Sequence, residues 1–142
     1  MKSLKRIVVA FALCLMVPFL SHAQIYFGGG MAYNSNSAKN AIGAMAKIGV
    51  GIANRFDING NATYYFRKET PLSFDLDLHY RLINLNEHFL IHPFVGVNFT
   101  GSNNSLALGT SFKVPTDTST YFFEPRYILD GKQWVFTLGI IL

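Results

Sequence analysis

The stretch Leu72-Ser-Phe-Asp-Leu-Asp-Leu-His-Tyr-Arg-Leu82 decides the fold, because apolar and polar residues alternate along its whole length. Leu, Phe or Tyr stands at every even position, and Ser, Asp, His or Arg stands at every odd position. A period of two predicts a β-strand with one apolar face and one polar face. On a helix the same residues would spread apolar groups around the whole circumference, so no amphipathic face would form.

The same alternation recurs in eight segments of about ten residues, separated by turn residues. The predicted strands are 24–33, 41–53, 56–67, 72–82, 88–100, 105–114, 119–129 and 133–142. The connections between them are short, which implies antiparallel neighbours, and an even number of up-and-down strands can close without a free edge. The sequence therefore predicts an all-β protein, an eight-stranded antiparallel up-and-down β-barrel.

Residues 1–23 have the composition of a cleaved signal peptide. A positively charged start precedes the apolar stretch from Ile7 to Leu20, and Ser21-His22-Ala23 supplies small residues at the cleavage site. The apolar run is short for an uncleaved membrane anchor, which is the alternative. The expected domains are therefore a signal peptide at 1–23 and a barrel domain at 24–142.

Removal of this segment changes what the charge implies. It takes three of the 12 Lys and Arg residues and none of the 8 Asp and Glu residues, which leaves nine against eight and a net charge of +1. A nearly neutral mature chain gives no reason to expect nucleic acid as a partner. The only cysteine, Cys14, lies in the same segment, so we expect neither disulfides nor thiol chemistry in the barrel, and no cofactor.

The two faces of the predicted strands suit a barrel in a membrane better than a barrel in water. The polar face carries many small residues, such as Gly28, Gly96 and Gly109, which fit a narrow lumen but weaken a water-facing strand. The other face is aromatic, with Tyr and Trp near strand ends, as in the interfacial girdles of outer-membrane barrels. These features predict a transmembrane barrel in contact with outer-membrane lipid and lipopolysaccharide. A soluble periplasmic ligand-binding barrel is an alternative.

The charged residues of the polar face are the candidates for a functional site. Four acids, four permanent bases and one histidine are expected to point inward: Lys47, Asp57, Asp75, Asp77, His79, Arg81, Lys113, Glu124 and Arg126. Buried charges must pair, so we expect an ion-pair network that fills the lumen. Asp75 and Asp77 are expected to pair with Arg81 and Lys113. A narrow pore for small or hydrophobic solutes is the alternative.

The acidic and histidine residues do not predict a metal site or an enzyme. Asp75, Asp77 and His79 are neighbours on one strand face about 7 Å apart, too far to share one small ion without help from another strand. No histidine has a serine at a fitting spacing, and no nucleophile elbow is present. A lipid-modifying outer-membrane enzyme stays open as an alternative, because catalytic triads assemble in space.

Pro93 and Pro125 stand within predicted strands, where each removes one donor from the hydrogen-bond ladder. A bulge or a tolerated strand-end position is expected at each. A lateral opening, of the kind that a lipid substrate would need, is the alternative.

Three segments carry a resemblance to a known family. They are His92-Pro-Phe-Val-Gly-Val97, Phe122-Phe-Glu-Pro-Arg-Tyr127 and Thr137-Leu-Gly-Ile-Ile-Leu142. In these the chain resembles the small eight-stranded outer-membrane β-barrel proteins, especially the generic outer membrane protein beta-barrel domain of Bacteroidetes-type bacteria. The resemblance implies the bacterial outer membrane, periplasmic termini and a porin-like barrel without an assigned activity, so a structural or membrane-maintenance role is expected.

The resemblance also implies a carboxy-terminal signal that the barrel-assembly machinery reads during insertion. Its residues here are Trp134, Phe136, Leu138, Gly139, Ile140 and Leu142. Leu142 departs from the family pattern, in which a terminal Phe is more usual. The sequence leaves the oligomeric state open.

Overall fold

The computed structural model describes residues 24–35, 41–67, 71–86 and 88–142. Among them, nine strand segments belong to one sheet: β1 (Ile25–Asn34), β2 (Ala41–Ala53), β3 (Phe56–Tyr65), β4 (Leu72–Tyr80), β5 (Ile83–Asn86), β6 (Phe89–Thr100), β7 (Asn103–Pro115), β8 (Thr120–Ile128) and β9 (Gln133–Ile141). The predicted signal peptide at 1–23 lies outside the described residues. Within the described ranges, no helix is both long and apolar enough to cross a membrane.

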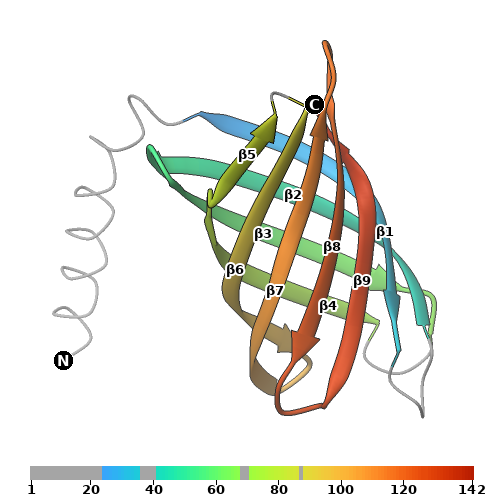
Figure 1. Cartoon of the computed structure of the whole chain (residues 1–142). Helices are drawn as coiled ribbons and strands as arrows, with labels where there is room; N and C mark the ends of the chain where they lie inside the picture. The colour runs from blue at the N-terminus through green and yellow to red at the C-terminus, as the bar shows by residue number, and fades with distance from the viewer. Residues whose placement is uncertain (1–23, 36–40, 68–70, 87) are drawn as a thin grey trace, which may run out of the picture.

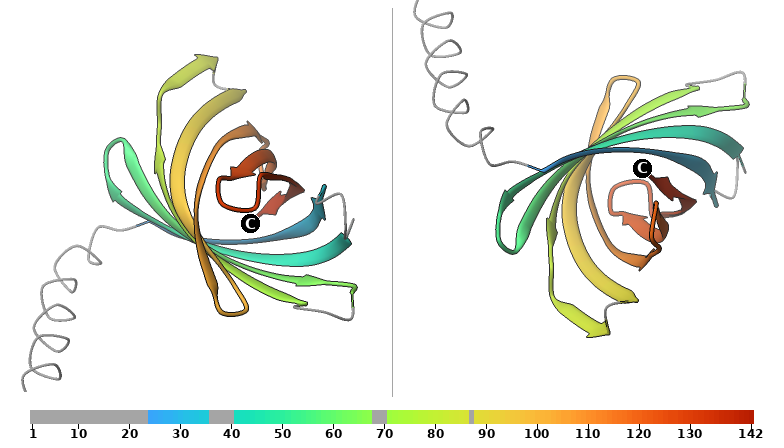
Figure 2. Two further views of the ribbon diagram at one scale, coloured as in Figure 1. Left: turned by 90° about the horizontal axis from the view of Figure 1, so that it is seen from below. Right: turned by 90° about the horizontal axis from the view of Figure 1, so that it is seen from above.

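The sheet closes on itself, because β1 pairs with β2 along one edge and with β9 along the other. On the opposite wall, β4 pairs with both β3 and β6. The short β5 continues the line of β4 beside β6, so the nine segments make the eight strands of one antiparallel barrel. Figure 2 shows the first strand (blue) beside the last (red). The predicted all-β, eight-stranded barrel is therefore confirmed.

A bulge separates β4 from β5 opposite Pro93. His79 pairs with Phe94 and Ile83 pairs with Ile91, so three residues on one side face two on the other. Proline has no backbone N–H to donate across the ladder, which is why the regular pairing stops here. One of the two predicted effects of proline, a local bulge, is present at this position.

Pro125 in β8 has a smaller effect on the ladder. Pairing between β7 and β8 stops after Gly109 and Arg126 and resumes at Phe112 and Phe123 in the same register. The missing donor thus interrupts the ladder without shifting it.

One predicted turn is wrong. Between the predicted strands 72–82 and 88–100, the sequence predicts a turn at 84–87, but Ile83–Asn86 form β5, and Asn86 pairs with Phe89. The sequence Ile-Asn-Leu-Asn itself alternates, so it prolongs the strand and pushes the reversal toward β6.

The turn between β6 and β7 is also shorter than the predicted span 101–104. Thr100 pairs with Asn103, which leaves only Gly101 and Ser102 to reverse the chain. Gly101 has a φ of 62°, a conformation that glycine adopts without steric cost.

The alternation places the side chains on two faces as predicted. Apolar side chains lie on the outside of the barrel and polar side chains on the inside, the reverse of a soluble protein. In β4 the outward side chains of Phe74 and Leu76 are 48 % and 54 % exposed, whereas the inward Asp77 and His79 are at most 1 % exposed. The fully buried side chains of the described chain include Asp57, Asn59, Ser73, Asp77, His79, Ser111 and Glu124. The interior is therefore mainly polar.

Two apolar clusters lie above and below this polar interior. One contains Ala32, Ala41, Tyr65, Ala107, Ile128 and Val135, and the other contains Met45, Phe122 and Ile141 with the half-buried Tyr26 beside it. They occupy different halves of the barrel, since the second includes residues from the start of β1 and the end of β9.

Candidate functional site

The lumen contains two cavities, one at each end of the barrel. The terminal cavity, of about 500 Å³, lies at the end where β1 begins and the chain finishes, and Gln24 and Leu142 line it. The far cavity, of about 450 Å³, lies under the turns that join β6 to β7 and β8 to β9. Figure 1 shows the start of β1 and the carboxy terminus at one end and these turns at the other. Buried side chains occupy the space between the cavities.

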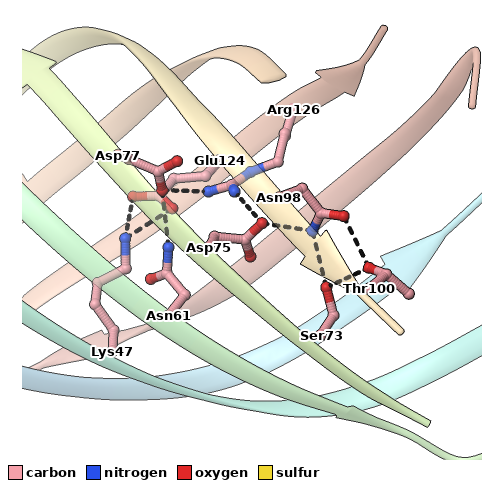
Figure 3. A network of polar contacts seen from close by, with 9 residues as sticks. All are labelled: Lys47, Asn61, Ser73, Asp75, Asp77, Asn98, Thr100, Glu124 and Arg126. Carbon is pink, nitrogen blue, oxygen red and sulfur yellow. Dashed lines mark hydrogen bonds and ion pairs between the residues drawn. The ribbon is translucent and has the colours of Figure 1, made fainter. Parts of the chain in front are cut away.

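The centre of this buried layer is Arg126, which reaches across the lumen from β8 to β4. Its Nη1 lies 2.6 Å from Asp75 Oδ1, and its Nη2 donates to Asp77 Oδ2 at 2.5 Å. The Arg126 side chain is only 5 % exposed, so these charges interact in a region from which water is excluded. Figure 3 shows the guanidinium lying between the two carboxylates.

Asparagine side chains complete the shell around the two carboxylates. Asn61 Nδ2 donates to Asp77 Oδ2 at 2.9 Å, and Asn98 Nδ2 donates to Asp75 Oδ1 at 2.6 Å. Asn98 also contacts Ser73, extending the hydrogen bonds toward the far cavity that both residues line (Figure 3). A buried carboxylate needs such donors in addition to its ion pair.

A second ion pair crosses the lumen between β2 and β8. Lys47 Nζ lies 2.6 Å from Glu124 Oε1 and 2.8 Å from Oε2, and Ser111 Oγ donates to the same carboxylate at 2.8 Å. Both charged side chains are at most 2 % exposed. The Lys47 ammonium also lies over the ring of Phe122, 4.7 Å from its centroid, which adds a cation–π contact.

The third pair joins neighbouring strands at the terminal end. Arg81 Nη2 donates to Asp57 Oδ1 at 2.5 Å and Arg81 Nε donates to Oδ2 at 3.1 Å, a bidentate arrangement. The Arg81 side chain is 35 % exposed and lines the terminal cavity.

His79 lies in the buried layer, and neither of its ring nitrogens has a hydrogen-bond partner in the described part of the chain. Its ring stacks on Phe94, with centroids 4.6 Å apart and planes 17° from parallel. The guanidinium of Arg126 also contacts this Phe94 ring, with its central carbon 5.0 Å from the ring centroid. Within the described residues, the contact made by this imidazole is therefore aromatic stacking.

The structure brings the nine predicted lumen residues to the inner face, but it changes their partners. The expected pairing of Asp75 and Asp77 with Arg81 and Lys113 is wrong, because Arg126 holds both carboxylates. Arg81 pairs with Asp57 instead. The reason is that charges on opposite walls of a narrow barrel approach each other as closely as those on neighbouring strands, and strand order alone does not reveal this.

No group of three or more His, Cys, Asp and Glu side chains among the described residues has the geometry to hold a metal ion. Asp75, Asp77 and His79 share one strand face, as predicted, but the two carboxylates are turned to Arg126. Of the other histidines, His92 is buried at the terminal cavity and His88 is exposed at the turn before β6.

Sequence reasoning from charge alone missed the neutral members of the layer. Asn61, Asn98 and Ser111 hold the carboxylates, and Phe94 and Phe122 support the cations. The signal that identifies them was available, because each stands at an inward position of its strand in the alternation.

The predicted carboxy-terminal signal lies on β9 and the residue after it. Trp134 and Leu138 point outward and are 46 % and 64 % exposed, whereas Gly139 faces inward. A Cβ at Gly139 would collide with the backbone oxygen of Gly29 and the ring of Phe122. Leu142 N donates to Phe27 O at 2.8 Å, so the end of the chain helps to close β9 against β1.

Comparison with known proteins identifies the fold and no closer relationship. No family model matches the chain, and no curated protein matches it. The predicted membership of the generic Bacteroidetes-type domain therefore stays a prediction.

Two solved structures share the architecture. The outer membrane protein Ail of Yersinia pestis, in a phospholipid bilayer nanodisc, matches with a TM-score of 0.52 at 14 % identity, over 83 % of this chain and 98 % of that chain. Neisserial surface protein A (NspA) matches with a TM-score of 0.52 at 17 % identity, over 84 % of this chain and 96 % of that chain. The chain described here thus has the closed β-barrel fold that these small outer-membrane proteins share.

Proposed function

We propose that the chain is an integral outer-membrane β-barrel with a packed polar lumen and a structural or membrane-maintenance role. The observation that carries the proposal is the inverted distribution of side chains, with ion pairs inside and large apolar groups outside. Phe27, Met31 and Leu106 are each more than half exposed on the outer face. A soluble monomer rarely exposes a continuous apolar surface of this extent, whereas lipid requires one.

The dimensions and the aromatic side chains of the outer face support the same conclusion. Strands of about ten residues, at about 3.3 Å per residue and a tilt of about 40°, span the apolar band of roughly 25 Å that outer-membrane barrels need. Phe89, Phe112, Phe123 and Phe136 stack in a row across β6 to β9, with successive centroids 6.2 to 6.4 Å apart. Lipid and lipopolysaccharide are the partners that suit this surface.

The buried layer supports a closed lumen. The two cavities have no lining residue in common, and the pairs Arg126–Asp77 and Lys47–Glu124 lie in the buried region of the barrel. Opening a continuous path would separate buried charges from their partners, at a free-energy cost of about 3–5 kcal/mol for each pair. We therefore expect the protein not to conduct ions.

Fractionation of cells that produce the full chain tests the location. The protein is expected in the outer-membrane fraction, and unheated samples should migrate faster on a gel than boiled ones because the closed barrel resists unfolding. Recovery in the soluble periplasm would overturn the proposal.

Planar-bilayer recordings test the closed lumen separately. We expect no reproducible unit conductance from the purified barrel. A steady conductance that Asp77→Ala or Arg126→Ala alters would show that ions pass through the charged layer, and a narrow pore would then replace the closed barrel as the function.

We also propose that β9 carries the signal for the barrel-assembly machinery. Support comes from the outward apolar positions Trp134, Phe136 and Leu138 at the seam that closes against β1. Leu138→Ser is expected to lower the amount of assembled protein in cells, while the outward Leu108→Ser, in the middle of the sheet, serves as the matched control. Equal losses for both variants would count against a special role of β9.

A further inference from the structure

The terminal cavity holds a cationic side chain that the ion-pair network does not use. Lys113 in β7 is 5 % exposed and lines this cavity together with His92 and Arg81. Among the described residues, no carboxylate lies within ion-pair distance of Lys113. The Lys113 ammonium instead lies over the ring of Tyr26, with Nζ 5.4 Å from the ring centroid. A buried ammonium with only a cation–π contact is an unusual arrangement, because burial of a charge normally requires an opposite charge.

The charge balance of the lumen makes the same point. Four permanent cations face four carboxylates, but Arg126 takes two of the carboxylates and leaves none for Lys113. Counted over side chains alone, the middle of the lumen therefore carries one excess negative charge, and the lining of the terminal cavity carries one excess positive charge.

Other groups of the terminal cavity are suited to an anion. His92 is 4 % exposed, and its Nδ1 has no hydrogen-bond partner among the described residues. Arg81 contributes positive charge while Asp57 holds its orientation. The turn between β7 and β8 adds hydroxyl-bearing lining residues, Thr116, Thr118, Ser119 and Thr120. The polar lining therefore consists mainly of N–H and O–H donors around the Lys113 ammonium, and its carboxylate, Asp57, is already paired with Arg81.

We propose that the terminal cavity is a binding site for an oxyanion, a phosphate or carboxylate group, with the Lys113 ammonium as its principal ligand. The cavity volume of about 500 Å³ admits such a group together with part of the molecule that bears it. The group enters from the end of the barrel where β1 begins and β9 ends. Two kinds of molecule carry such an oxyanion: a soluble phosphorylated or carboxylated molecule, and an anionic phospholipid with its headgroup.

The experiment is a titration of the whole barrel, refolded in uncharged maltoside micelles, with inorganic phosphate, followed by the NMR shifts of backbone amides. We expect saturable shifts at Lys113, His92 and the β7–β8 turn. Lys113→Gln should weaken phosphate binding about tenfold or more, since it removes a charged hydrogen-bond donor. Lys113→Arg should retain binding. Lys132→Gln is the matched control, because Lys132 is an exposed lysine in the turn between β8 and β9 at the other end.

Heat-modifiable migration establishes that each variant is folded before it is titrated. The proposal is overturned if phosphate gives no saturable shifts in the wild-type barrel, or if folded Lys113→Gln binds phosphate as tightly as the wild type. Repeating the titration in phosphatidylglycerol nanodiscs identifies the source: weaker phosphate binding than in micelles indicates that the lipid headgroup occupies the site, and unchanged binding indicates a soluble oxyanion. Failure of this site would leave the closed-barrel proposal untouched, because that rests on fractionation and conductance.

Discussion

The middle of the lumen and the terminal cavity contain the same types of side chain in different states of pairing. In the middle, Arg126 and Lys47 each contact at least one buried carboxylate. At the terminal cavity, Lys113 lies over the ring of Tyr26 and has no carboxylate partner among the described residues. The central cations pair with carboxylates, whereas Lys113 does not pair with one among the described residues. The lumen therefore consists of two parts, a stabilising central layer of ion pairs and the terminal cavity.

The largest effect is expected from Arg126→Met, which tests the paired region. This change leaves Asp75 and Asp77 buried without their cation, and it should lower the free energy of unfolding by about 3–5 kcal/mol. Urea unfolding of the barrel in lipid vesicles measures it. Adding Asp75→Asn and Asp77→Asn should recover much of the loss. A loss below about 1 kcal/mol would show that the central charges do not stabilise the barrel.

The pair that crosses from β2 to β8 should show strong coupling. Lys47→Met and Glu124→Gln are each expected to cost about 3 kcal/mol, because each leaves a buried partner unmatched. The double variant should be more stable than the sum of the two losses predicts. Unfolding free energies of the four proteins measure the coupling, and simple additivity would contradict a direct interaction.

Two Gly→Ala substitutions test the difference in space between the inner and outer faces of the barrel wall, because each adds one methyl group. Gly96→Ala places a Cβ against Asp77 Oδ1 and 2.6 Å from Leu76 O, so a loss of about 1–3 kcal/mol in unfolding free energy is expected. Gly60→Ala on the outer face meets Ile48 Cγ2 at an ordinary 3.5 Å and should change stability by no more than about 0.5 kcal/mol. Equal effects would mean that the lumen has room that the structure does not show.

Only a small effect is expected from Lys113→Met. The change removes a buried charge without leaving a carboxylate unpaired, so the unfolding free energy should stay within about 1 kcal/mol of the wild-type value or rise. The same urea titration measures it beside Arg126→Met. A loss as large as that of Arg126→Met would show that Lys113 has a carboxylate partner in the folded barrel.

Much of the fold follows from the sequence because the period of two is a local property. Each residue from Leu72 to Tyr80 lies on the face that its parity predicts, and the same holds for the charged inward positions of the other strands. The bulge at Pro93 was predictable for the same reason, since a missing N–H is a property of one residue. The turn at 84–87 was misplaced because asparagine suits turns but also fits the polar side of a strand.

The pairing inside the lumen was not predictable in the same way. Arg126 meets Asp75 and Asp77 only because β8 and β4 lie on opposite walls, a relation that depends on strand tilt and barrel diameter. Along the chain, Arg81 is the cation nearest to these acids, but nearness in sequence does not decide the pairing. Only the closed structure shows that Asp57 holds Arg81.

The ion pairs that span the lumen have a consequence for how the barrel assembles. The contacts of β8 with β2 and β4 join strands that are not neighbours in the sheet, so they form only when the sheet has curled around. A strand inserted one residue out of step would turn its buried charges toward lipid, at a cost of about 2–4 kcal/mol for each Lys or Arg near the bilayer midplane. The ion pairs across the lumen thus stabilise the barrel late in assembly, and only when its strands pair in the correct register.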